Sequence, residues 1–231
     1  MSATPTFKIE TPKSLGAIVA KRLREAIIDG EFALGAMIPE ETLATSFGVS
    51  RTPVREALNQ LQLAGLVVVK PQRGSYVFEA HEDDVAALCE FRCVVEPRAA
   101  ELAWQHDREA TIDAVAAAIA EMAAARKLKD AVRYSRADTR LHEAFVEHCG
   151  NPYVQAAYAT AGAKIAALRT HLSAGTDVLN PAGFEQHKRL LDLFKAGDMP
   201  AFDALMREHA TGTRNAYVAN LKARQARGVA T

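Results

Sequence analysis

The chain has few cysteines and no net charge, and each shortage argues against a class of protein. Its 231 residues include only three cysteines, Cys89, Cys93 and Cys149, an odd number at no zinc-finger spacing. We therefore expect buried free thiols in a reducing cytoplasm rather than a disulfide framework. The formal net charge of +0 excludes a global basic field, and residues 1–79 are also nearly neutral. Any binding to nucleic acid must then come from local placement of charge.

Long hydrophobic runs are also missing. No apolar run approaches the roughly 18 residues of a membrane-spanning helix, and residues 1–14 lack the apolar core of a signal peptide. We therefore expect a soluble, cytoplasmic protein with no membrane partner. The length suits two domains of ordinary size.

The most informative stretch is the segment 47–58, which reads FGVSRTPVREAL. Gly48 suits a tight turn because a residue without Cβ tolerates a positive φ. Ser50 or Thr52 can cap a following helix, and Pro53 would sit in its first turn, where a missing N–H does no harm. This pattern predicts the turn and second helix of a helix-turn-helix.

The second predicted helix has two different faces. Val54, Leu58 and Leu61 recur at i, i+4 and i+7, so they share a buried face. The other flank carries Arg51, Thr52, Arg55 and Asn59. Arginine pairs with guanine edges or phosphates and asparagine with adenine, so this flank suits the major groove of DNA. The alternative is an ordinary surface helix with two arginines.

The segments on both sides favour the DNA interpretation. Residues 38–44 have the pattern of a short first helix. The second helix is expected to end near Gly65, and the β-branched segments 66–69 and 75–78 are expected to form a two-stranded wing with Arg73 near its tip.

The N-terminal part is expected to contain one further helix. Residues 1–13 are predicted to be a mobile arm. Ser14 can cap a helix over 15–29, and residues 32–37 are expected to form a loop. The side chains expected to face inward from this helix are Ile18, Leu23 and Ile27.

A polar linker at residues 79–84 is expected to separate a winged helix-turn-helix at 14–78 from a second domain at 85–225. The second domain is rich in Ala and Leu and shows helical periodicity throughout. Its predicted helices lie near 82–106, 109–129, 131–149, 152–172, 182–196 and 198–224. The fold class is therefore mainly α, with a small β-wing in the first domain and an all-α bundle in the second.

Asp138 and His142 are spaced at i and i+4 on one predicted helix, so both side chains lie on one face and can bind one metal ion. His187 and His209 fall on the last two predicted helices, beside apolar residues. A single histidine on an amphipathic helix is more often exposed or bonded to a neighbour, so spacing alone leaves both interpretations open.

The first domain closely resembles a known family. Residues 15–78 resemble the winged helix-turn-helix of the GntR family of bacterial transcription regulators, through SRTPVREAL, LxxAGLV and PQRGSYV. The resemblance implies DNA contacts from the second helix and the wing. We assign them to Ser50, Arg51, Thr52, Arg55, Arg73 and Gly74. Many relatives have a basic residue where this chain has Glu41, and a carboxylate there would repel phosphate.

The second domain resembles the ligand-sensing FCD domain of the FadR-like branch of that family. Six helices rather than seven would place it near the VanR-type subgroup. In FCD domains that bind a metal, Asp-x-x-x-His lies on one helix and one His on each of two later helices. The resemblance therefore implies a ligand set of Asp138, His142, His187 and His209. The other histidines, which are expected at the surface or in linkers, are His81, His106, His148 and His171.

Three imidazoles and one carboxylate suit Zn²⁺, Ni²⁺, Co²⁺ or Mn²⁺. In the family, the remaining metal positions take water or the carboxylate of a small organic acid. Arg92 matches a position where the family often has an inward arginine, which implies a bidentate contact to the same carboxylate. The alternative is a surface arginine paired with Glu96 at i, i+4.

These features together predict a metal-dependent, ligand-responsive transcription repressor, which binds a pseudo-palindromic DNA operator as a homodimer and is not an enzyme. One alternative is a hydrolase that uses the three-His, one-Asp site. Against it, no second carboxylate is spaced to act as a general base, and the winged domain would have no role. A third alternative is an architectural DNA-binding protein without a ligand.

Overall fold

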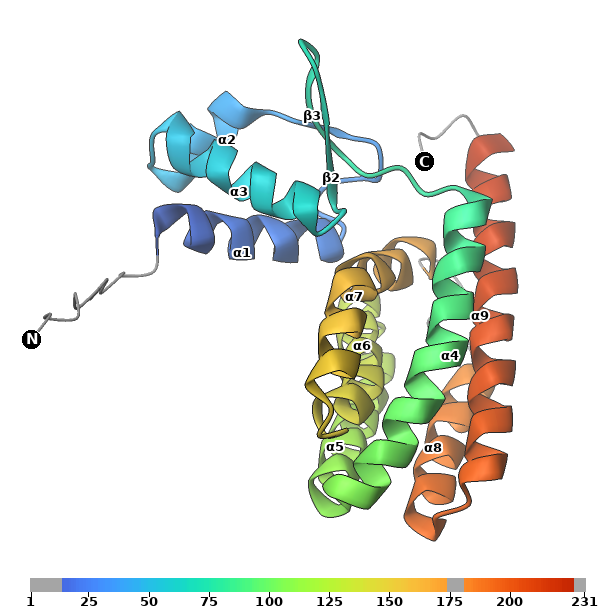
Figure 1. Cartoon of the computed structure of the whole chain (residues 1–231). Helices are drawn as coiled ribbons and strands as arrows, with labels where there is room; N and C mark the ends of the chain where they lie inside the picture. The colour runs from blue at the N-terminus through green and yellow to red at the C-terminus, as the bar shows by residue number, and fades with distance from the viewer. Residues whose placement is uncertain (1–13, 174–180, 227–231) are drawn as a thin grey trace, which may run out of the picture.

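The computed structural model describes residues 14–173 and 181–226, in which a winged domain sits on one end of a helical bundle (Figure 1). The elements of the winged domain are α1 (Leu15–Ile28), β1 (Met37–Ile38), α2 (Glu40–Phe47), α3 (Arg51–Leu63), β2 (Val67–Lys70) and β3 (Gly74–Val77). The bundle consists of α4 (Glu82–His106), α5 (Arg108–Leu128), α6 (Ala131–Glu147), α7 (Pro152–Leu172), α8 (Pro181–Ala196) and α9 (Met199–Ala226). The mainly-α class and the six helices of the bundle are confirmed within this described part.

Helix α1 begins as predicted, because the Ser14 hydroxyl accepts a hydrogen bond from the Ala17 N–H at 3.2 Å. Leu23 and Ile27 are fully buried. The inward position expected for Ile18 is wrong, since its side chain is 53% exposed. Ile18 precedes Leu23 by five positions, about 140° around the helix, and therefore lies off the buried stripe.

The small sheet has one strand more than predicted. Met37 and Ile38 were expected to end a loop and begin a helix, but they form β1, which pairs antiparallel with β3 in the order β1-β3-β2. Pro39 explains the difference, because the residue before a proline is biased towards extended backbone. Helix α2 begins only at Glu40 and ends at Phe47, and its C-cap Gly48 takes a positive φ of 65° as predicted.

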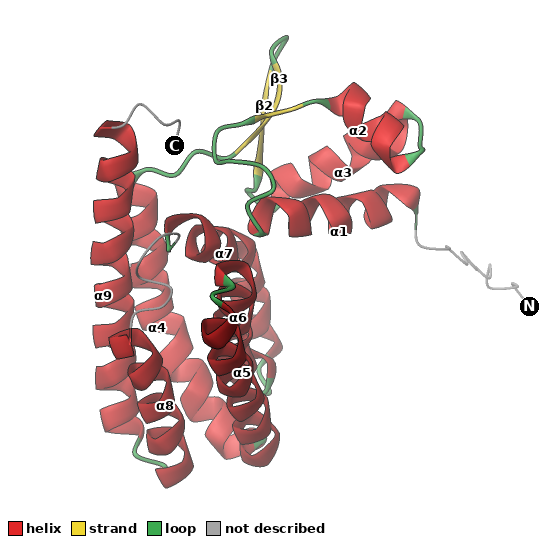
Figure 2. Ribbon diagram, turned by 180° about the vertical axis from the view of Figure 1, so that it is seen from behind, coloured by secondary structure: helices red, strands yellow, loops and turns green. Residues whose placement is uncertain are grey.

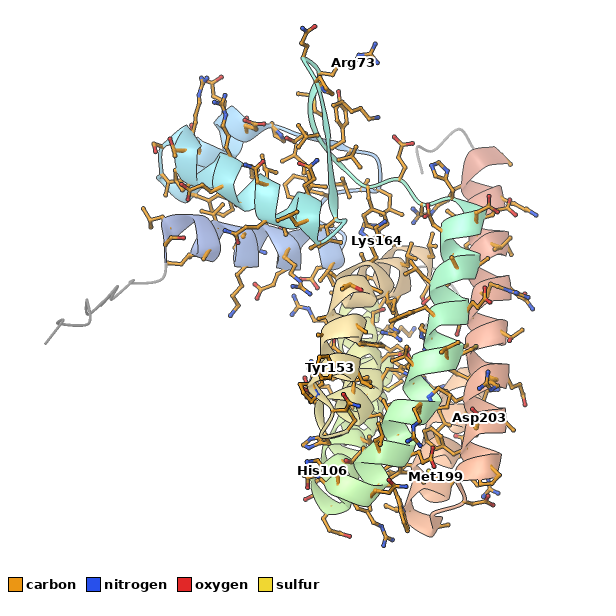
Figure 3. The ribbon with its side chains drawn as sticks, in the orientation of Figure 1. Arg73, His106, Tyr153, Lys164, Met199 and Asp203 are labelled. Carbon is orange, nitrogen blue, oxygen red and sulfur yellow. The ribbon has the colours of Figure 1, made fainter. Side chains whose placement is uncertain are left out.

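Helix α3 buries Val54, Leu58 and Leu61 as predicted. Ser50 occupies its N-cap position, but the hydroxyl makes no capping hydrogen bond. The wing projects away from the bundle, with Arg73 at its tip (Figure 3). The wing turn contains Gly74 with a φ of 102°, a conformation that glycine adopts without strain.

Helices α4 and α9 run side by side along one face of the bundle, and α5, α6 and α7 form the other face (Figure 2). Part of the bundle core is a cluster of phenylalanine rings. Phe145 lies 5.4 Å from Phe194 and 5.2 Å from Phe202, measured between ring centroids. None of the helices in the described ranges is apolar enough over its length to span a membrane.

The two domains share apolar packing. One core cluster continues from α1 and α3 to Ala167, Leu168 and Leu172 of α7 and to Leu221 of α9. His171 lies in this region and is buried, so its expected position at the surface or in a linker is wrong. Its Nε2 donates to the Ile27 carbonyl at 2.8 Å, which ties α7 to the C-terminal end of α1.

Candidate metal centre and nucleic-acid interface

Three histidines from three helices meet inside the bundle. His142 of α6, His187 of α8 and His209 of α9 each place a ring nitrogen within 4.8 Å of the others. Their exposed fractions are 0%, 2% and 8%. The structure thus brings three of the four predicted ligands into one buried group that could hold a metal ion.

Two of the three rings are oriented by a neighbour. Nδ1 of His142 lies 3.0 Å from a carboxylate oxygen of Glu96, and Nδ1 of His209 lies 3.1 Å from the amide oxygen of Gln186. These oxygens only accept, so each Nδ1 carries the proton and donates. A histidine that donates from Nδ1 can offer Nε2 to a metal ion, which is the arrangement that metal-binding histidines adopt.

His187 differs from the other two, because neither of its buried ring nitrogens has a hydrogen-bond partner among the described residues. An unsatisfied buried polar group costs about 1–3 kcal/mol, which a metal ion bound to this ring would offset. Burial lowers the pKa of His187 to about 4, and it lowers the pKa of His209 as well. Both rings are therefore neutral at pH 7, as metal coordination requires.

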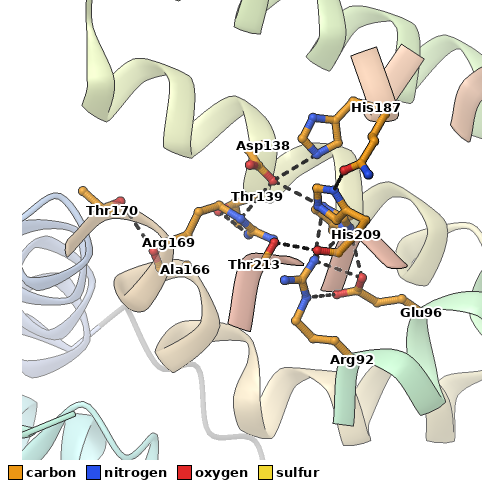
Figure 4. A network of polar contacts seen from close by, with 12 residues as sticks. Arg92, Glu96, Asp138, Thr139, Ala166, Arg169, Thr170, His187, His209 and Thr213 are labelled. Carbon is orange, nitrogen blue, oxygen red and sulfur yellow. Dashed lines mark hydrogen bonds and ion pairs between the residues drawn. The ribbon is translucent and has the colours of Figure 1, made fainter. Parts of the chain in front are cut away.

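Asp138 lies beside the three histidines, and its carboxylate also contacts an arginine (Figure 4). Its Oδ1 is 3.3 Å from His142 Nε2, 3.8 Å from His187 Nε2 and 2.9 Å from Arg169 Nε. Burial alone would raise the pKa of Asp138, but Arg169 and the imidazoles hold it well below its usual range. The carboxylate is therefore ionised and fits the donor set.

Arg169 was missed by the sequence reasoning. It is buried on α7, and its Nη1 donates to Thr139 Oγ1 at 2.9 Å. Its Nη2 has no hydrogen-bond partner in the described part of the chain. The sequence did contain a signal, because Arg169 lies between the apolar run 165–168 and Leu172. A charged side chain in such a buried stretch needs a partner.

Arg92 faces inward, and the alternative of a surface arginine is wrong, although the pairing with Glu96 is present. Arg92 Nε donates to Glu96 at 2.8 Å, and both side chains are buried. Arg92 Nη2 lies 3.3 Å from His142 Nε2. Glu96 is the carboxylate near the cluster that the spacing did not reveal. It also accepts from the Tyr158 hydroxyl at 3.0 Å, so it is engaged rather than free to act as a base.

A cavity of about 300 Å³ adjoins the cluster and is lined by Asp138, His187 and His209. Its other polar lining includes Arg92, Arg169, Tyr134 and Tyr217. Two cations and two phenol groups around a small volume suit an anionic ligand of modest size.

The predicted DNA-binding residues lie on α3, at its N-cap and on the wing. Ser50, Thr52 and the two arginines of α3 are exposed, as is Arg73 on the wing, whereas Gly74 is partly exposed. Both arginines of α3 are paired with consecutive carboxylates of α2. Arg51 pairs with Glu41, and Arg55 Nε lies 3.2 Å from Glu40.

Comparisons with known proteins agree with this architecture. The model of the FCD domain matches residues 84–212, and the model of bacterial regulatory proteins of the gntR family matches residues 15–77. An uncharacterized HTH-type transcriptional regulator of Streptomyces ambofaciens is 33% identical over 199 residues, which are 81% of this chain and 78% of that protein.

Two further proteins are similar at lower identity. The galactonate operon transcriptional repressor of Escherichia coli is 26% identical over 213 residues, which are 83% of this chain and 92% of that protein. The crystal structure of a transcriptional regulator from Rhodococcus sp. RHA1 aligns with a TM-score of 0.79 at 23% identity and covers 88% of this chain and 97% of that one. This last likeness supports the fold alone.

Proposed function

Because the chain belongs to the GntR family of bacterial transcription regulators and carries an FCD domain, we propose that it is a repressor whose affinity for operator DNA is set by a small organic acid bound at a divalent metal ion. We assign DNA binding to residues 14–78 and sensing to residues 85–225. The family is one of regulators rather than enzymes, so the hydrolase alternative is set aside. The observation that supports a ligand most directly is His187, whose buried ring nitrogens lack hydrogen-bond partners beside a cavity.

The residues that would hold the metal are Asp138, His142, His187 and His209. Imidazole and carboxylate donors favour Zn²⁺, Ni²⁺, Co²⁺ or Mn²⁺. When bound, the ion supplies a positive charge to which a carboxylate oxygen of the effector can coordinate. Glu96 and Gln186 accept hydrogen bonds from Nδ1 of two of these histidines, and such bonds fix the orientation of metal-binding rings.

Arg92 and Arg169 are the side chains that would recognise the rest of the acid. When His142 Nε2 is used as a metal ligand, it no longer accepts from Arg92, and Arg92 Nη2 becomes available to a carboxylate. Arg169 Nη2 lines the same cavity without a hydrogen-bond partner among the described residues. The similarity to a galactonate operon repressor makes sugar acids the first compounds to test.

Two helices of the sensing site also hold α1 of the winged domain. Helix α6 carries Asp138 and, two residues earlier, Arg136, whose Nε donates to Asp29 at 2.7 Å. Helix α7 carries Arg169 and, two residues later, His171, which donates to the end of α1. A ligand that shifts Asp138 would therefore act close to the Arg136–Asp29 contact, and one that shifts Arg169 would act close to the His171–Ile27 contact. A second route would run from Arg92 along α4 to the segment that joins the two domains.

The proposed role on DNA requires a homodimer in the cytoplasm. One recognition helix reads only a few base pairs, so two copies on a pseudo-palindromic operator are needed for useful specificity. An effector that changes how α1 is held would change the spacing of the two recognition helices and weaken operator binding.

A thermal-shift screen tests the ligand class. Sugar acids and small di- and tricarboxylic acids are added to metal-loaded protein and to protein treated with a chelator. The proposal expects at least one acid to raise the melting temperature of the metal-loaded protein only. Equal shifts in both samples would show that the acid binds without the metal.

A further inference from the structure

The first turn of α2 carries two consecutive carboxylates, and each binds one of the two arginines of the recognition helix α3. Glu40 pairs with Arg55 and Glu41 with Arg51. Both arginines are more than half exposed and lie on the face assigned to DNA. In the absence of DNA, each arginine of the predicted reading surface is therefore paired with a carboxylate.

The two pairs differ in how they are built. The side chain of Glu40 is 29% exposed and also accepts from Ser75 Oγ of β3 at 3.1 Å, so it links α2, α3 and the wing. Glu41 is 79% exposed, and the structure pairs it with Arg51 alone among the described residues. An exposed ion pair of this kind contributes little to stability. The consequence of the Glu41 contact is therefore electrostatic rather than structural.

We propose that Glu41 is a specificity-determining residue, which keeps Arg51 off the DNA backbone until a guanine edge is available. When Arg51 binds a backbone phosphate, it only exchanges the Glu41 carboxylate for another oxygen anion. A guanine in the major groove offers a bidentate contact to O6 and N7, which is stronger than an exposed ion pair. Glu41 thus lowers binding to random sequence more than binding to the operator.

This inference rests on the proposed role of Arg51 in contacting DNA, and it makes a quantitative statement about salt. A basic residue that neutralises one phosphate adds about 0.9 to the slope of log K against log[salt] on duplex DNA. Removing the charge of Glu41 would release Arg51 to a phosphate in the non-operator complex. In the operator complex, Arg51 contacts a guanine rather than a phosphate, so the slope for operator binding should change less.

The test uses the full chain and two duplexes, one selected from a random pool by the wild-type protein and one of scrambled sequence. Binding is titrated at four or more salt concentrations for the wild type, Glu41→Gln and the control Glu31→Gln. Glu31 is also an exposed carboxylate, paired with Arg22 of α1 at 2.9 Å. For Glu41→Gln, the expected result is tighter non-operator binding, by roughly 3–10-fold per bound protomer near 0.1 M salt, with a slope steeper by about 0.9 for each protomer on the duplex. Operator selectivity should fall. No difference between Glu41→Gln and Glu31→Gln would overturn the inference.

The double variant Arg51→Ala/Glu41→Gln separates this inference from the proposed function. Against an Arg51→Ala background, Glu41→Gln should change neither the affinity nor the slope on the scrambled duplex. A gain that persists without Arg51 would show direct repulsion between Glu41 and phosphate, which contradicts the inference. Unchanged operator affinity in Arg51→Ala alone would instead remove the DNA role of Arg51, and the inference with it.

Discussion

At the scale of single residues, His187 and Arg92 have opposite environments. His187 is buried with ring nitrogens that lack hydrogen-bond partners in the described structure, whereas Arg92 is buried with its charge balanced by Glu96. The unpartnered imidazole favours a ligand, whereas the charge of Arg92 is already balanced by Glu96 before any ligand binds. Substitution of these residues should therefore have different effects.

His187→Ala should lose most of the metal, because it removes one ligand of a set that spans three helices. Elemental analysis of purified wild type should find about one divalent ion per chain, and metal should raise its melting temperature by mass action. His81→Ala is the control, since His81 is an exposed residue of the linker. Full metal content in His187→Ala would show that the ligand set is wrong.

Arg92→Ala should reduce the free energy of unfolding by about 3–5 kcal/mol, because it leaves the Glu96 carboxylate buried without its cation. Burial alone would raise the pKa of Glu96, and Arg92 and His142 are what hold it well below its usual range. Arg98→Ala on the same helix should cost less than about 1 kcal/mol, since the Arg98–Glu101 pair is exposed. Denaturant titration compares the two variants, and similar losses would contradict the buried-pair account.

At the scale of elements, helices α6 and α7 each serve two sites. Each carries a residue of the sensing site and, two positions away, a residue that holds α1. An i, i+2 spacing puts the two side chains on different faces of a helix, one towards the cavity and one towards the winged domain. We therefore expect small changes at the proposed site to be carried along a rigid helix rather than through a loop.

Arg136→Ala should leave metal and effector binding intact and reduce the effect of the effector on operator affinity. Coupling between two sites is typically about 1–3 kcal/mol, and this variant should lose a measurable part of it. Arg133→Ala is the matched control, because Arg133 lies one turn away on α6 and pairs with Glu121 of α5 rather than with α1. Operator titrations with and without effector give the coupling, and equal coupling in both variants would remove the α6 route.

The elements that depend on local pattern could be predicted from the sequence, and those that depend on distant contacts could not. The buried face of α3 follows from spacing, and the helices of the bundle follow from periodicity and breaks. Strand β1 was missed because two residues show no alternation, and it exists only by pairing with β3. The burial of His171 could not be predicted either, because its hydrogen-bond partner is the Ile27 carbonyl, 144 residues away in the chain.

The candidate site shows the same limit. Asp138 and His142 share a helix face, so their proximity follows from spacing. Arg169 and Glu96 reach the cluster from α7 and α4, and only the packing of the bundle brings them there. Sequence spacing paired Glu96 with Arg92 but gave no reason to place Glu96 or Arg169 at the cluster.

At the scale of the whole molecule, we expect two copies of the 25.0 kDa chain on each operator. Light scattering should give the mass of a dimer. A footprint should show two half-sites about 10–10.5 base pairs apart or a multiple of this spacing. Inserting about half a helical turn between them should weaken binding strongly, because both recognition helices cannot then enter the groove on one side of the DNA. Equal affinity for the inserted duplex would contradict dimeric recognition.

The central claim is that an acid bound at the metal site controls operator affinity. The measurement that tests it most directly is an operator titration of metal-loaded wild type and His187→Ala, each with and without the acid identified by thermal shift. We predict that the acid weakens operator binding of the wild type by about 5–150-fold, a coupling of about 1–3 kcal/mol, and leaves His187→Ala unchanged. An equal response in both proteins, or no response of the wild type to any acid that binds, would contradict the claim.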